Sequence, residues 1–145
     1  MGQRQWKDCQ IIAGSNPALR TNTLIHKTMK AQTFQQQLLT SKQDSHMRFF
    51  KSIQAGDYTL SIQASEGHYC TPRVTVCPGD YSTMEMAIWR TKGSKTFLDF
   101  PKSSTMRGFS HYRELMRFSD GSHPTVFGYV PVWIIQKLIN YLKSK

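Results

Sequence analysis

The sequence lacks the segments that would direct a protein into or across a membrane. It contains no apolar run near the roughly 18 residues that a transmembrane helix requires. Its N-terminus also lacks the charged, apolar and small-residue pattern of a secretory signal peptide. From these two absences we predict a cytoplasmic protein that does not associate with a membrane.

Cysteine is scarce, with three residues in the whole chain: Cys9, Cys70 and Cys77. An odd number without an export signal argues against a disulfide framework, so we expect three thiols. Cys70 and Cys77 are separated by six residues, whereas structural zinc sites favour pairs about two to four residues apart. The sequence therefore predicts no bound metal, and no motif indicates a cofactor.

Acidic residues are also few, because 9 Asp and Glu stand against 19 Lys and Arg and the formal net charge is +10. An excess of positive charge raises the local concentration of polyanions and speeds encounter with them. The acids are scattered singly, so no carboxylate pair is available for acid–base catalysis. No glycine-rich loop that could cradle a phosphate is present either. These absences make an enzyme less favoured than a binding protein.

Residues 1–28 show no hydrophobic periodicity, and Ala13 to Ala18 read A-G-S-N-P-A. Back-translation of Gly-Ser-Asn-Pro permits GGT-TCG-AAT-CCN, which contains the T-arm sequence GGTTCGAATCC of a transfer-RNA gene. We interpret residues 1–28 as a disordered or spurious extension read from such a gene, with one domain over residues 29–145; a polar loop that matches by chance is the alternative. Since mobile elements insert beside transfer-RNA genes, the protein is predicted to be bacterial cargo of a prophage or another mobile element.

From Met29 onward the pattern predicts an α+β domain, in which two or three helices pack on a small antiparallel sheet of about four strands. Strands are predicted by alternation at residues 58–64, 82–90 and 125–130, with a hairpin turn at 91–95 leading to a further strand at 96–100. Helices are predicted at 34–39, where Thr33 is the N-cap, at 103–118 and at 132–142. In the last of these, Ile135, Leu138, Ile139 and Leu142 form one apolar face, which predicts a helix in the core.

Two groups of residues are candidates for ligand binding. His68, Tyr69 and Arg73 gather functional side chains just after the first predicted strand. The second group combines basic residues with nearby aromatic residues: Arg90, Lys92, Lys95, Arg107, Arg113 and Arg117. Arginine pairs with phosphate oxygens and aromatic rings stack on bases, so this surface is a candidate for nucleic acid. A solvated helix face above a core stripe is the alternative reading.

No motif in the chain names a reaction. We therefore expect a small binding protein that occupies a protein or nucleic-acid surface, and the sequence indicates neither which of the two it is nor the oligomeric state. The alternative is a small enzyme with a site around Cys70 and His68, in which Cys70 is the nucleophile and His111 or His123 the base.

Overall fold

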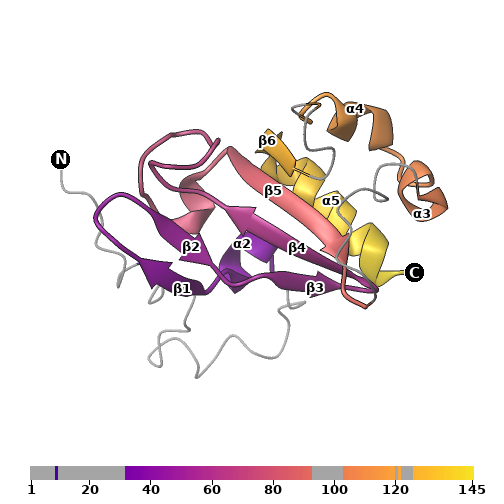
Figure 1. Ribbon diagram of the computed structural model, residues 1–145, viewed down its shortest axis with the longest axis horizontal. Coiled ribbons are helices and arrows are strands. Elements are labelled where there is room, and N and C mark those ends of the chain that lie inside the picture. Colours follow the sequence, from indigo (N-terminus) through magenta and orange to yellow (C-terminus); the bar gives the residue numbers. More distant parts are fainter. Residues whose placement is uncertain (1–8, 10–31, 93–102, 120, 122–125) are drawn as a thin grey trace, which may run out of the picture.

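The fold is known from a computed structural model of the chain, which describes residue 9 and residues 32–92, 103–119, 121 and 126–145 (Figure 1). The elements follow one another as α2 (Phe34–Gln37), β1 (Thr40–Gln43), β2 (Arg48–Phe50), β3 (Ile53–Ala55), β4 (Tyr58–Gln63), the 3-10 turn η2 (Pro78–Asp80), β5 (Thr83–Arg90), α3 (Ser104–Arg107), α4 (Tyr112–Met116), β6 (Val126–Pro131) and α5 (Val132–Lys143). Strands and helices mix along the chain, which confirms the predicted α+β class.

The strands form a four-stranded antiparallel sheet in the order β3-β4-β5-β6 and a separate β1-β2 hairpin. The predicted strands at 58–64, 82–90 and 125–130 correspond to β4, β5 and β6. Strands β1, β2 and β3 were not predicted, because three or four residues are too few to establish an alternating pattern. The predicted strand at 96–100 lies outside the described residues.

Helix α5 lies across one face of the four-stranded sheet and supplies much of its core (Figure 1). Its buried residues are Ile134, Ile135, Leu138, Ile139 and Leu142, each at most 1% exposed. The strand residues buried with them include Leu60, Ile62, Met84, Met86, Ile88 and Phe127. Each such apolar side chain contributes about 1.5–3 kcal/mol through burial. The prediction that the C-terminal helix belongs to the core is confirmed.

The other predicted helices are shorter than expected. Thr33 caps α2 as predicted, in a capping box with Gln36, but Leu38 is already extended and leads into β1. The helix predicted over 103–118 is broken into α3 and α4, with Gly108 at the C-cap of α3. The break occurs where Phe109 turns its side chain into the core, at 3% exposure. Residues 108–111 form a turn between the two helices, so Phe109 and Leu115 are both buried without a continuous helix.

The turn between β3 and β4 brings the end of α5 against the sheet. Gly56 adopts a φ of +58°, and a Cβ atom there would collide with the carbonyl oxygen of Leu142. Glycine is therefore required both for the backbone conformation and for the close approach. The backbone carbonyl oxygen of the adjacent Asp57 accepts a hydrogen bond of 2.9 Å from the amide of Thr91, which links the turn to the end of β5. None of the helices in the described ranges is long and apolar enough to cross a membrane.

Candidate functional site

A basic pocket lies where the β3–β4 turn, the end of β5, α3 and the end of α5 meet. Its volume is about 380 Å³. It is lined by Gly56, Asp57, Tyr58, Arg90, Lys92, Thr105, Leu142 and Lys145. Three of these side chains are cationic and one, Asp57, is a carboxylate. We call these eight residues the basic pocket.

The wall of the basic pocket is held by contacts between elements that are distant in the sequence. The hydroxyl of Tyr141 on α5 donates a 2.7 Å hydrogen bond to the carbonyl of Thr105 on α3. The ammonium group of Lys145 lies 4.9 Å from the centre of the Tyr141 ring, a cation–π contact. The Tyr58 hydroxyl is 3.5 Å from Ser103 Oγ. These contacts hold α3 next to the C-terminal end of α5 and next to β4, and residues from all three regions line the cavity.

The composition of the basic pocket suits an anionic group. Small-ligand pockets have volumes of about 300–1,000 Å³, so this cavity can admit one phosphate group or one nucleotide. Arg90 and Lys92 both come from the group of basic residues that the sequence singled out. Lys145, by contrast, was not among the residues that the sequence singled out.

A second group of functional side chains surrounds Tyr69, and we call Tyr69, Arg73, Glu85 and Tyr129 the tyrosine cluster. The Tyr69 and Tyr129 rings are 5.8 Å apart and are 53% and 42% exposed. The Arg73 guanidinium lies 5.3 Å from the centre of the Tyr69 ring. A Glu85 carboxylate oxygen accepts a 3.1 Å hydrogen bond from the Tyr69 amide. The sequence singled out Tyr69 and Arg73 but not Tyr129, which lies about sixty positions downstream in a predicted strand.

The remaining predicted binding residues are spread over the surface. Arg107, Arg113 and Arg117 are exposed on and after the short helices α3 and α4, and none of them lines the basic pocket. Lys95 lies outside the described residues. The structure therefore brings together Arg90 with Lys92, and Tyr69 with Arg73, without joining all the candidates into one surface.

His68 and Cys70 are both buried, at 4% and 1% exposure. Ser65 Oγ lies 2.7 Å from His68 Nδ1, and burial lowers the pKa of the His68 imidazole. The Cys70 thiol donates to the carbonyl oxygens of Ser65, at 3.3 Å, and Pro72, at 3.4 Å, and burial raises its pKa. A reactive cysteine needs an exposed thiol with a lowered pKa, so Cys70 has the opposite properties.

His111, one of the two candidate bases, belongs to a different cluster. Its Nδ1 lies 3.2 Å from a Glu114 carboxylate oxygen, and its Nε2 lies 3.4 Å from the Lys137 ammonium. Its ring packs edge-on against Trp133 at 5.1 Å. His123, the other candidate, lies outside the described residues.

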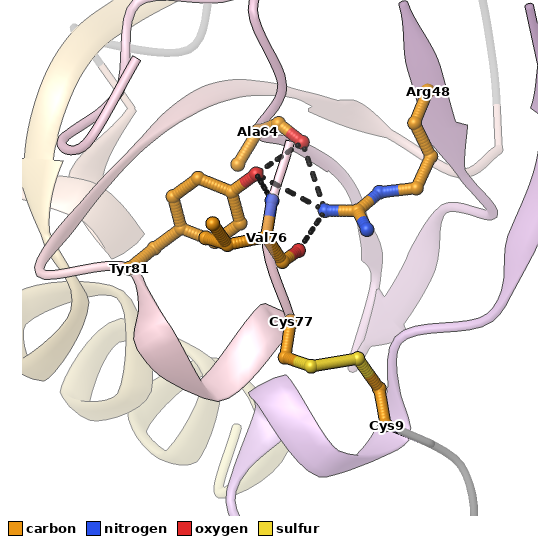
Figure 2. The surroundings of a disulfide bond; sticks show 6 residues. All are labelled: Cys9, Arg48, Ala64, Val76, Cys77 and Tyr81. Carbon is orange, nitrogen blue, oxygen red and sulfur yellow. Dashed lines mark hydrogen bonds between the residues drawn. A yellow bond between two sulfur atoms is a disulfide. The ribbon is translucent and has the colours of Figure 1, made fainter. Parts of the chain in front are cut away.

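Cys9 and Cys77 form a disulfide, with their Cα atoms 5.5 Å apart (Figure 2). The expectation of three thiols is therefore wrong for two of the three cysteines, and Cys70 alone is a free thiol. The argument from an odd number fails because it counts cysteines without determining which of them meet in the fold. The bond also links the N-terminal stretch, from which we expected no structural role, to the loop between β4 and β5.

Next to this disulfide lies a buried arginine that the sequence did not reveal. Arg48 is 1% exposed, and within the described part of the chain no carboxylate pairs with it and its Nε has no hydrogen-bond partner. Its Nη2 donates to the carbonyl oxygens of Ala64 (3.3 Å) and Val76 (2.8 Å) and to the hydroxyl of Tyr81 (3.1 Å), as Figure 2 shows. Burial lowers the pKa of Arg48. The arginine thus stabilises the loop that carries Cys77 through hydrogen bonds to backbone carbonyls.

In the ranges that the structure describes, no three His, Cys, Asp or Glu side chains are close enough together to hold a metal ion. Among the described residues, we take the basic pocket and the tyrosine cluster as the candidate binding sites. Comparison with protein-family models, with curated proteins and with solved structures finds no match to this chain.

Proposed function

We propose that this protein binds single-stranded nucleic acid and that the basic pocket holds part of the phosphate backbone. The observation that carries the proposal is that Arg90, Lys92 and Lys145 all line one cavity, in which Asp57 is the single acidic side chain. Arginine and lysine are the side chains that most often contact phosphate oxygens. A cavity of about 380 Å³ has room for one phosphate group with its sugar.

The charge of the whole domain supports the same proposal. Residues 29–145 alone contain 15 Lys and Arg against 8 Asp and Glu, so the basic excess does not depend on the N-terminal stretch. A broad positive field speeds association with a polyanion and holds it before it reaches the pocket. A protein partner, the other reading of the sequence, would need a specific acidic surface to exploit this field.

The rival function, an enzyme with a site around Cys70 and His68, has less support. Both side chains are buried, and the pKa of the Cys70 thiol is raised, so the thiolate needed for attack is disfavoured. A histidine with a lowered pKa could still accept a proton, but His68 is 4% exposed. Binding without covalent chemistry is therefore the simpler proposal.

Location and origin remain part of the proposal and rest on the sequence. We keep the cytoplasm as the proposed location, and the transfer-RNA-like stretch favours a bacterial mobile element or prophage. The Cys9–Cys77 disulfide argues against the cytoplasm, because disulfides persist mainly in oxidising compartments. Detecting the protein in fractions of its native host would decide between the two compartments.

The test of nucleic-acid binding is a titration of a fluorescently labelled oligothymidylate with the full-length protein at several salt concentrations. We expect the logarithm of the affinity to fall linearly with the logarithm of the salt concentration, because each neutralised phosphate releases counterions. Replacing Arg90 and Lys92 by Glu should weaken binding and make the slope less steep by about 1.4, for two lost contacts to a single strand. If the wild-type protein does not retain DNA or RNA at low salt, a protein partner becomes the better proposal.

The matched control reverses two lysines outside the pocket. Lys42 and Lys51 are exposed and do not line the cavity, so Lys42→Glu with Lys51→Glu changes the net charge equally. An equal loss in both double variants would mean that net charge, and not the pocket, determines binding. Arg113→Glu with Arg117→Glu forms a third arm, for which we expect an intermediate loss because these arginines meet the ligand only if it extends beyond the pocket.

A further inference from the structure

The tyrosine cluster occupies the edge of the four-stranded sheet, on the face opposite α5. Met84, Met86 and Phe127 are buried on the α5 side, so the alternation of strand residues places Glu85 and Gly128 on the other face. A Cβ atom on Gly128 would lie 3.1 Å from Tyr69 Cβ. The absence of a side chain at Gly128 therefore makes room for Tyr69 to lie over this edge of the sheet.

Tyr129 is aimed by a β-bulge. Met84 pairs with Val130 and Met86 pairs with Phe127, so two residues of β6, Gly128 and Tyr129, stand opposite the single residue Glu85. Tyr129 has a φ of +56°, a strained conformation that bulky side chains rarely adopt. Its amide donates a 2.9 Å hydrogen bond to the Tyr69 carbonyl, which holds the two tyrosines together.

This strained position leaves an aromatic ring in solvent, although nothing in the packing of the core requires it there. Tyr129 is 42% exposed and its neighbours in β6, Phe127 and Val130, are 0% exposed. Bulges commonly re-aim a side chain beside a functional site. Arg73 lies over the Tyr69 ring, and the Glu85 carboxylate accepts a hydrogen bond from the Tyr69 amide. An exposed aromatic pair with an arginine, in a basic protein, has the chemistry that stacks nucleobases.

We infer that Tyr129 and Tyr69 form a stacking platform for the bases of the single strand whose backbone the basic pocket holds. The inference rests on the proposed function and extends it from phosphates to bases. The two sites lie toward opposite ends of β5, because Arg90 ends the strand at the pocket and Glu85 lies near its start. The rise of a strand, about 3.3 Å per residue, separates Arg90 from Glu85 by roughly 17 Å along β5. Because Leu142 of α5 lines the basic pocket while the tyrosine cluster lies on the face opposite α5, the bound single strand has to pass around the edge of the sheet to contact both sites.

The test compares two polyanions, an oligothymidylate and an inorganic polyphosphate with the same number of phosphates, on the full-length protein. Tyr129→Ala should lower the affinity for the oligothymidylate about tenfold, since removing an aromatic ring on which a base stacks typically weakens binding by about an order of magnitude or more. It should leave both the polyphosphate affinity and the salt dependence unchanged. Tyr129→Phe keeps the ring and should bind both ligands like the wild type. Trp133→Ala, which removes another aromatic residue with 45% exposure, is the matched control and should change neither affinity.

The outcomes separate this inference from the proposed function. If the wild type binds both ligands and Tyr129→Ala binds the oligothymidylate equally well, or loses both ligands in parallel, the stacking platform is wrong and the basic pocket stands. If the wild type binds neither ligand, the proposed function fails and the inference fails with it. Equal melting temperatures of Tyr129→Ala and the wild type are required, so that loss of binding cannot be assigned to unfolding.

Discussion

The hydroxyl of Tyr81 lies 3.1 Å from Nη2 of Arg48, in the interior of the protein and beside the loop that carries Cys77 (Figure 2). The same hydroxyl donates to the carbonyl of Val74 at 2.7 Å and accepts from the amide of Val76 at 3.1 Å. The hydroxyl of Tyr81 thus provides hydrogen-bond partners for backbone groups of a loop that has no β-sheet pairing of its own. Burial raises the pKa of Tyr81, so the hydroxyl keeps its proton over the ordinary pH range.

Replacing Tyr81 by Phe should therefore lower the free energy of unfolding by about 1–3 kcal/mol. The reason is that the Val76 amide and the Arg48 guanidinium lose a partner in a buried place, where unpaired polar groups are costly. Urea denaturation measures the change. Tyr69→Phe removes a hydroxyl from a side chain that is 53% exposed, and is expected to change stability by less than about 0.5 kcal/mol. Equal stability of the two variants would mean that the buried cluster does not stabilise the loop.

The stability should also decrease in mild acid because of His68. Burial lowers the pKa of His68 below its ordinary 6.5, so the unfolded chain binds a proton at a higher pH than the folded protein does. The contribution of His68 is complete above pH 6.5 and is lost as the pH falls below that value. Glu85 opposes this shift and Arg48 adds to it. Unfolding free energies measured from pH 8 to pH 5 should therefore fall.

The control for this pH dependence is another histidine. His68→Asn should flatten the decline between pH 6.5 and 5, whereas His46→Asn should keep it, because the His46 side chain is 77% exposed. A wild-type curve that is flat over this range would contradict the argument. An unchanged decline in His68→Asn would assign the effect to other groups.

Helix α5 provides the third prediction. Leu138 is 0% exposed between the helix and the sheet, so Leu138→Ala should cost about 2–5 kcal/mol, which combines lost burial with the cavity that remains. Asn140→Ala on the exposed side of the same helix should cost less than about 0.5 kcal/mol. Thermal denaturation of both variants measures the difference, and a Leu138→Ala protein that melts like the wild type would show that α5 is peripheral.

The elements that the sequence predicted are those with a long periodic pattern. Alternation over β5 and the apolar face of α5 extend over two or more repeats, so sequence alone locates both. The β1–β2 hairpin is short and one of its strands, β1, is largely exposed, and such strands leave no alternating signal. The break between α3 and α4 falls within the predicted apolar stripe, so the spacing of the apolar residues carries no sign of it.

The candidate site was predicted only in part for the same reason. Arg90 and Lys92 are close together in the sequence, so their proximity in the structure could be predicted from the sequence. Lys145 joins them only because Gly56 lets the end of α5 approach the β3–β4 turn. Tyr129 lies beside Tyr69 only because of a bulge in β6. A glycine at the position with positive φ would have indicated a bulge, but that position is occupied by Tyr129, so the sequence pattern of the strand did not reveal it.

The disulfide gives the last prediction. Cys9 and Cys77 are 68 positions apart, and removing a native disulfide typically costs about 2–5 kcal/mol. In protein purified without reductant, Cys9→Ser and Cys77→Ser should lower the melting temperature equally, and the double variant no further, because both remove the same bond. Truncation at Met29 should have the same effect as Cys9→Ser, and no effect in the presence of a reductant if residues 1–28 are otherwise dispensable. Peptide mapping by mass spectrometry detects the bond directly.

Two outcomes would contradict this prediction. If the wild type and Cys9→Ser have the same melting temperature without reductant, Cys9 forms no bond that stabilises the fold. If truncation lowers the stability even with reductant, residues 1–28 pack on the domain by other contacts.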